Sequence, residues 1–154
     1  MTGLDAYLGE HEIGTPAQME QFGRRVGGVL GVGDLVVLTG PLGAGKTTLT
    51  RGIAAGLGVR GPIQSPTFVI ARTHPSLAAG PVLIHVDAYR LGSAHELDDL
   101  DLDLDGSVLI VEWGRGLVDG LRERWWEIEL LPQPTEDDAL DAEAPRRLLV
   151  TGLP

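Results

Sequence analysis

The feature that most constrains this chain is a glycine-rich loop between an apolar run and a helix-forming segment. The apolar run at residues 35–38 predicts a buried strand, and a helix is expected to begin at about Lys46. The loop matches the P-loop template G-x-x-x-x-G-K-[ST] through Gly40, Gly45, Lys46 and Thr47. The order strand, loop, helix is the context that this template requires. A chance match at this composition has a rate well under ~1%, so the stretch predicts a nucleotide-binding α/β fold.

The residue types in this loop suit a chain of phosphates. Glycines allow successive backbone N–H groups to turn inward around an anion, and the start of a helix adds a partial positive charge of about half a unit. Lys46 is expected to reach the β- and γ-phosphates, and the Thr47 hydroxyl to ligate Mg²⁺. Lys46 is also the only lysine in the chain, beside eleven arginines, which favours a specific use for its compact ammonium group.

Length and composition limit the classes of protein to which the chain can belong. With 154 residues, 43% of them hydrophobic, it has the size of one domain with one core. The absence of cysteine excludes disulfides, thiolate zinc sites and cysteine nucleophiles. No apolar stretch approaches the ~18 residues of a membrane span, and the first residues do not resemble a secretory signal. We therefore expect one soluble domain over 1–154, in the cytoplasm and without a membrane partner.

The net charge of −10 is unevenly distributed. Residues 96–105 hold six acids and no base, and residues 136–143 hold five more acids. Tight binding to nucleic acid depends on clustered lysine and arginine that neutralise phosphates. The charge therefore argues against independent binding to tRNA, and the acidic runs are either solvated loops or contacts for a basic protein partner.

The spacing of apolar and turn-forming residues predicts the order of elements. Thr15, Pro16 and Gln18 have the pattern of an N-cap, a first-turn proline and a capping-box glutamine for a helix that continues to Gly31. The turn at 13–15 is expected within reach of a nucleotide base. The P-loop helix should stop at 56–58. The other expected elements are an edge strand at 7–13, a strand entered through 65–67, a hairpin loop at 73–81, strands at 82–87 and 108–113, a short helix at 93–97, and antiparallel strands at 125–131 and 147–151 around a flexible loop at 132–145. This order predicts a P-loop NTPase-like α/β fold, with a mainly parallel sheet flanked by helices and antiparallel strands at its edges.

Two carboxylates follow apolar strands at the edge where α/β folds bind ligands. Asp87 ends the run 82–87, and Glu112 lies at the end of the run 108–113. Mg²⁺ prefers oxygen ligands, so one acid is expected to hold the metal or its waters and the other to orient the attacking water or the metal. The alternative is that either acid only caps the turn that follows.

Other polar and aromatic residues allow a functional and a structural interpretation. Ser65 and Thr67 flank a proline and are either a γ-phosphate sensor or a turn that leads into a strand. Arg90 either meets phosphate charge or pairs with the acidic loop. His85 lies inside a strand, where a hydrogen-bonded core histidine is favoured over a ligand. Trp113 is either a packing aromatic or an anchor for a partner.

Five motifs occur in order along the chain: residues 40–48 (GPLGAGKTT), 65–68 (SPTF), 85–91 (HVDAYRL), 96–97 (EL) and 111–113 (VEW). In this order and in a chain of this length, they resemble the bacterial TsaE (YjeE) family over about residues 13–131. The P-loop is common to many ATPases, whereas the other motifs as a set are specific. The resemblance implies the ATPase component of the machinery that makes N6-threonylcarbamoyladenosine (t6A) at position 37 of tRNAs reading ANN codons.

The resemblance also implies partners and site residues. The partners are the TsaB and TsaD proteins, and tRNA is met only through their complex. Lys46, Asp87 and Glu112 are implied as catalytic residues, Thr47 with the two acids as the magnesium site, and residues 65–68 as a switch. The complete set of predicted ATP-binding residues is Thr15, Gly40, Leu42, Gly43, Ala44, Gly45, Lys46, Thr47, Thr48, Ser65 and Thr67.

The chain departs from the family pattern at two places. Pro41 replaces the aspartate of the usual Gly-Asp-Leu-Gly, and residues 97–103 lack the glycine that often follows the E-L pair. Two other functions remain open on sequence alone. A small P-loop metabolite kinase would transfer phosphate to an added small acceptor, and a nucleotide-gated interaction module would bind without multiple turnovers.

Overall fold

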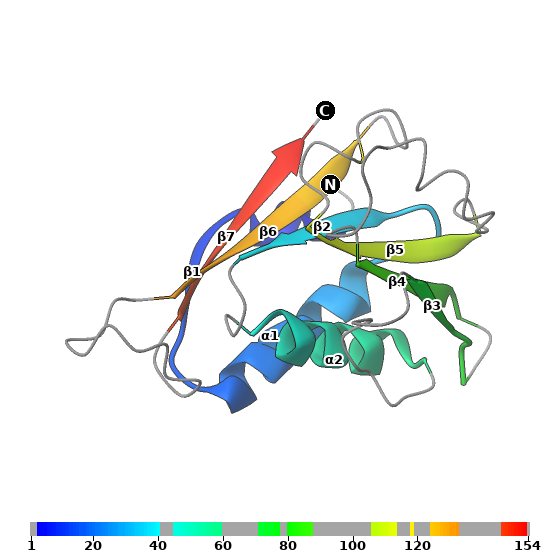
Figure 1. The fold of residues 1–154 in the computed structure, drawn as a ribbon, viewed down its shortest axis with the longest axis horizontal. Helices are drawn as coiled ribbons and strands as arrows, with labels where there is room; N and C mark the ends of the chain where they lie inside the picture. Colours follow the sequence, from blue (N-terminus) through cyan, green and yellow to red (C-terminus); the bar gives the residue numbers. More distant parts are fainter. Residues whose placement is uncertain are drawn as a thin grey trace.

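The computed structural model describes residues 3–40, 45–59, 71–77, 80–87, 106–113, 118, 124–132 and 146–153. Seven strands form one mixed sheet in the order β1-β7-β6-β2-β5-β4-β3 (Figure 1). The elements are a 3-10 helix η1 (Gly3–Tyr7), β1 (Gly9–Ile13), α1 (Pro16–Val29), β2 (Leu35–Thr39), α2 (Lys46–Leu57), β3 (Ala71–His74), β4 (Val82–Asp87), β5 (Ser107–Glu112), β6 (Trp125–Pro132) and β7 (Arg146–Leu153).

The centre of the sheet is parallel and its edges are antiparallel. Strands β6, β2, β5 and β4 run parallel to one another. The antiparallel pairs are β3 with β4 at one edge, and β6 with β7 and β7 with β1 at the other. The fold class predicted from the sequence is confirmed.

Both described α-helices cover the same face of this sheet (Figure 1). Alternate residues of the central strands, such as Val36, Leu38 and Ile110, join Phe22 of α1 and Ile53 of α2 in one buried cluster. The intervening strand residues form a second cluster on the opposite face. Because successive side chains of a strand point to opposite faces, burial on both faces explains why β2 and β5 read as continuous apolar runs.

Glycines bring α1 and α2 into backbone contact. A Cβ atom on Gly23 would lie 2.5 Å from the Leu49 carbonyl oxygen, and one on Gly52 would lie 2.1 Å from the Glu20 carbonyl oxygen. Gly27 and Gly56 have equally close neighbours on the facing helix. These glycines recur every four residues on both helices, so a hydrogen atom is the largest group that the contact accepts.

The caps of both helices agree with the sequence. The Thr15 hydroxyl accepts a hydrogen bond from the Gln18 N–H at 3.1 Å, and the Gln18 side chain accepts one from the Gly14 N–H at 2.6 Å. Gln18 thus reaches one residue further back than the predicted capping box requires. Gly58 ends α2 in the left-handed conformation, with its N–H directed to the Ala54 and Ala55 carbonyls, as a C-terminal glycine does.

Several predicted boundaries were wrong. Strand β5 covers 107–112 and not 108–113, β6 includes Pro132 of the predicted loop 132–145, and β7 covers 146–153 and not 147–151. The edge strand begins at Gly9 and not at residue 7, because 3–7 form a 3-10 helix and Gly9 has a positive φ of 110°. Helix α1 ends at Val29, two residues before Gly31. The predicted hairpin loop 73–81 is shorter at its start, because Thr73 and His74 pair with β4.

Several predictions lie outside the described residues. They are the turn at 65–67, the helix at 93–97, Arg90, the acidic run at 96–105, and the loop at 133–145.

Candidate functional site

The loop between β2 and α2 ends at a glycine whose backbone conformation only glycine adopts easily. Gly45 precedes the first residue of α2 with φ 107° and ψ 15°, a region that side chains disfavour. Its carbonyl accepts the Leu49 N–H at 2.9 Å, which begins the helical ladder. A Cβ on Gly45 would lie 3.2 Å from the Met19 side chain of α1. The first turns of α1 and α2 therefore meet beside the loop.

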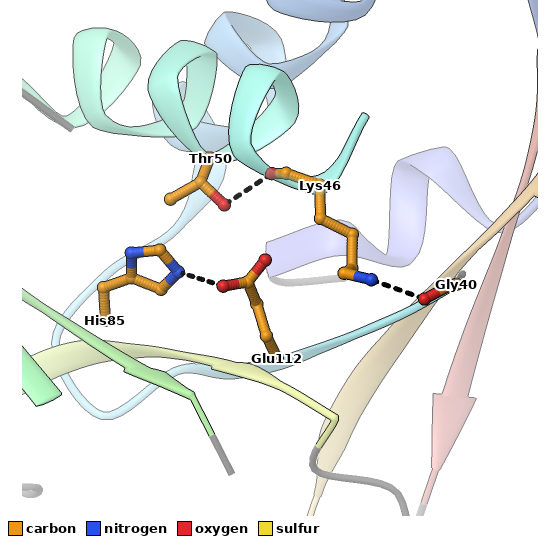
Figure 2. A network of polar contacts seen from close by, with 5 residues as sticks. All are labelled: Gly40, Lys46, Thr50, His85 and Glu112. Carbon is orange, nitrogen blue, oxygen red and sulfur yellow. Dashed lines mark hydrogen bonds and ion pairs between the residues drawn. The ribbon is translucent and has the colours of Figure 1, made fainter. Parts of the chain in front are cut away.

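Lys46 begins α2 and directs its side chain toward Gly40, the residue that follows β2 (Figure 2). Its Nζ donates a hydrogen bond to the Gly40 carbonyl oxygen and lies 4.0 Å from the centre of the Trp113 ring. Only 7% of Lys46 is exposed. Burial lowers the pKa of Lys46, while the charges of Glu112 and Asp87 act in the opposite direction. The ammonium group thus contacts a carbonyl oxygen and an aromatic face, and the charges of two nearby acids favour its protonated form.

Trp113 reaches the lysine through an unusual backbone conformation. Its φ is 62°, a left-handed value that costs a side-chain-bearing residue roughly 1–2 kcal/mol. Its N–H donates to the Leu38 carbonyl at 3.2 Å, which ties the end of β5 to the end of β2. In this conformation the Trp113 ring supplies a π face for the Lys46 cation.

The two predicted acids are side by side at one edge of the sheet. Asp87 ends β4 and Glu112 ends β5, and the parallel register pairs these two residues directly. Glu112 is 3% exposed, whereas Asp87 is half-buried. The negative charges of both acids act to raise the pKa of Lys46, against the larger effect of burial. The structure therefore brings together the three residues that the sequence proposed as catalytic.

A buried histidine contacts Glu112 from the neighbouring strand. His85 Nε2 lies 3.0 Å from Glu112 Oε2, and the histidine has no exposed surface (Figure 2). The expectation of a hydrogen-bonded core histidine is confirmed. His85 and Asp87 are two residues apart on β4, so both belong to the same face of the sheet as Glu112.

The hydroxyl residues around the site have different settings. Thr47 and Thr48 are half-buried in the first turn of α2. Thr50 is fully buried, and its hydroxyl donates to the Lys46 carbonyl at 2.8 Å. The Thr15 hydroxyl caps α1, and its assignment to the nucleotide stays a prediction. Leu42, Gly43, Ala44, Ser65 and Thr67 lie outside the described residues.

The residues present are compatible with a phosphate-bound Mg²⁺. Within the ranges that the structure describes, no group of three or more acids and histidines could enclose a metal ion by itself. A P-loop site does not need such a group, because phosphates and waters complete the ligand set of Mg²⁺. Here a hydroxyl residue, Thr47, follows the lysine, and Glu112 and Asp87 end the neighbouring strands. This donor set of oxygens suits a hard cation.

Comparison with known proteins identifies the family. The model of the family described as "Threonylcarbamoyl adenosine biosynthesis protein TsaE" matches residues 13–139. The chain belongs to the TsaE family. The family acts in tRNA threonylcarbamoyladenosine biosynthesis, and its match includes every residue discussed above for the site.

Relatives of the TsaE family are similar over most of the chain. A Streptomyces coelicolor protein named "tRNA threonylcarbamoyladenosine biosynthesis protein TsaE" is 54% identical over 140 residues, which are 88% of this chain and 90% of that protein. A Mycobacterium tuberculosis protein of the same name is 52% identical over 117 residues, 70% of each chain. The crystal structure of Bacillus subtilis YdiB has a TM-score of 0.66 and 26% identity, and covers 93% of this chain and 83% of that one.

Two contacts of this TsaE site were not predicted from the sequence. The packing of Trp113 on Lys46 requires a left-handed backbone, which nothing in the local sequence indicates. The pairing of His85 with Glu112 had a signal, since strand alternation places His85 on the same face as Asp87.

Among the described residues, no helix is long and apolar enough to cross a membrane.

Proposed function

We propose that this protein is a P-loop ATPase that binds and hydrolyses ATP with Mg²⁺ to support t6A formation at position 37 of tRNAs reading ANN codons. It acts in the cytoplasm, as one domain over residues 1–154, together with TsaB and TsaD. It is not itself the threonylcarbamoyl transferase. The observation that carries the proposal is the convergence of Lys46 with Glu112 and Asp87 at the ends of α2, β5 and β4.

Lys46 supplies the positive charge that binds the phosphates. In the structure its ammonium group occupies a nearly buried position at a helix N-terminus, where an anion is favoured by the helix dipole and by unpaired N–H groups. When a phosphate enters the loop, the Lys46 ammonium group replaces its hydrogen bond to the Gly40 carbonyl with a hydrogen bond to the phosphate. Hydrogen bonds between two charged groups are stronger than those to a neutral carbonyl.

Glu112 and Asp87 supply the acid groups of hydrolysis. Thr47, Glu112 and Asp87 are the residues proposed to hold Mg²⁺ or its waters, and the metal would neutralise part of the charge of the phosphates. Glu112 is buried in contact with His85, and Asp87 is more exposed at the same edge. The two acids therefore differ in burial and in contacts. This difference is consistent with two roles, in which one acid orients the attacking water and the other holds the metal.

The charge of the chain supports a role inside a larger assembly. A net charge of −10 disfavours direct contact with tRNA phosphates. A partner that carries the tRNA removes this difficulty. Nucleotide-dependent changes at residues 65–68 are proposed to report the state of the site to the partners, with hydrolysis resetting the complex between rounds of modification.

Reconstitution tests this function directly. Purified protein is combined with TsaB, TsaD, their threonylcarbamoyl donor, unmodified tRNA and ATP, and the nucleosides are analysed after digestion of the tRNA. We expect t6A to accumulate over many turnovers only when this protein and ATP are present. A single round of modification without ATP turnover would favour the nucleotide-gated interaction module, and t6A formation without this protein would refute the proposal.

A further inference from the structure

A buried histidine beside the proposed catalytic acid has no role in the function described so far. His85 is 0% exposed and lies in β4 between the apolar residues Ile84 and Val86. Burying an imidazole without hydrogen bonds is costly, and a leucine at this position would pack without that cost. We therefore expect the ring nitrogens of His85 to have a role that an apolar side chain could not fill.

The two ring nitrogens of His85 differ in their contacts. Its Nε2 lies 3.0 Å from Glu112 Oε2, while its buried Nδ1 has no hydrogen-bond partner among the described residues. A carboxylate can only accept, so Nε2 carries the proton and donates it. Within the described part of the chain the ring makes one hydrogen bond, and its acceptor is Glu112.

This bond fixes one oxygen of a flexible side chain. Glutamate has three side-chain torsions, and ordering such a side chain has an entropic cost. With Oε2 occupied by His85, the second oxygen of Glu112 is directed toward the first turn of α2 (Figure 2). Lys46 begins that turn, and the charge of Glu112 acts on it. The hydrogen bond from His85 therefore sets the orientation of the Glu112 carboxylate, with its second oxygen toward the start of α2.

We propose that His85 is a positioning residue that orients the Glu112 carboxylate for ATP hydrolysis. The inference rests on the proposed ATPase function and adds a residue to it. Because such supporting contacts typically change activity by about 10- to 100-fold, the effect is large enough to separate from a loss of packing.

Two substitutions at His85 and one matched control test the inference. His85→Leu fills the space without a donor, and His85→Gln places an amide N–H near the position of Nε2. His74→Gln is the control, because His74 is also a buried histidine of this sheet, on the adjacent strand β3. Each full-length variant is measured by thermal unfolding, nucleotide affinity and steady-state ATP hydrolysis, the last with the partner proteins present.

We expect His85→Leu to lower kcat by about 10- to 100-fold with KM changed less than about threefold, and His85→Gln to retain most of kcat. His74→Gln should leave kcat unchanged even if it unfolds at a lower temperature. Equal kcat for wild type and His85→Leu would overturn the role of His85 and leave the ATPase proposal intact. Wild-type protein without hydrolysis would overturn both.

Nitrogen NMR of the nucleotide-free protein gives a readout that is independent of hydrolysis. The signals of His85 are assigned by their loss in His85→Gln. We expect Nε2 of His85 to carry a proton, and a ring protonated on Nδ1 alone would refute the proposed hydrogen bond to Glu112.

Discussion

Lys46 is the only lysine of the chain, and the structure places it nearly buried at the start of α2. We predict that Lys46→Ala weakens nucleotide binding by about 10- to 150-fold, because a charge-assisted hydrogen bond contributes roughly 1.5–3 kcal/mol. Calorimetry with ATP and Mg²⁺ measures the affinity. Arg51→Ala removes an exposed cation five residues later on the same helix and should bind as wild type does. Wild-type affinity in a folded Lys46→Ala protein would contradict the P-loop assignment.

The two strand-end acids are expected to serve hydrolysis more than binding. We predict that Glu112→Gln and Asp87→Asn keep the fold and most of the nucleotide affinity but lose most of the hydrolysis, because an amide supplies no negative charge to the metal or the water. Phosphate release and nucleotide affinity are measured on the same samples. Glu12→Gln, an exposed carboxylate of β1, is the control. Normal turnover in both acid variants would show that the acids are structural caps.

At the level of residues, the sequence was sufficient where chemistry follows from spacing. The template fixed Gly45 and Lys46, and the carboxylates were expected because parallel strands end at one edge of a sheet. It was insufficient where a contact depends on tertiary geometry. The stacking of Trp113 on Lys46 depends on a positive φ and on the hydrogen bond from Trp113 to Leu38, and neither leaves a local pattern.

The contact between α1 and α2 depends on the absence of side chains. A Cβ at Gly52 would lie 2.1 Å from a backbone oxygen of α1, so it cannot be accommodated unless the helices separate. We predict that Gly52→Ala lowers the free energy of unfolding by about 1–3 kcal/mol, measured by urea denaturation. Gly28→Ala, in α1 and with no atom within 4 Å of the added Cβ, should instead stabilise by up to about 1 kcal/mol through helix propensity. Equal stability of Gly52→Ala and wild type would contradict the backbone contact.

At the level of elements, the sequence predicted most helices and strands but not the close contact between the helices. Thr15, Pro16 and Gln18 marked the start of α1 because a cap is a local hydrogen-bond pattern. The sequence predicts a helix stop at 56–58 and no contact through Gly23, Gly27 or Gly52, although the four-residue spacing places the glycines of each helix on one face. Which face a glycine presents to another helix is a tertiary property, so spacing alone could not assign the contact.

At the level of the whole molecule, the class of fold followed from the order of elements, whereas the strand order did not. Antiparallel strands at 125–131 and 147–151 were expected because a loop connects them. The placement of β6 beside β2, and of β1 beside β7, joins segments more than 80 residues apart. Such pairings depend on the assembly of the entire sheet. They place the start of α1 and the P-loop at the same side, where Met19 lies next to Gly45.

The distribution of charge over the whole molecule predicts where tRNA is bound. Neutralising phosphates requires clustered cations, and this chain has a net charge of −10 with its only lysine buried in the P-loop. We predict that the isolated protein does not bind tRNA with submicromolar affinity even at low salt, and that its ATP turnover is slow until TsaB and TsaD are added. Fluorescence anisotropy with labelled tRNA and a phosphate-release assay measure these quantities, and the complete mixture serves as the positive control for tRNA binding. Submicromolar binding by the protein alone would place the tRNA contact on this chain, and ATP turnover indifferent to the partners would leave the hydrolysis uncoupled from tRNA modification.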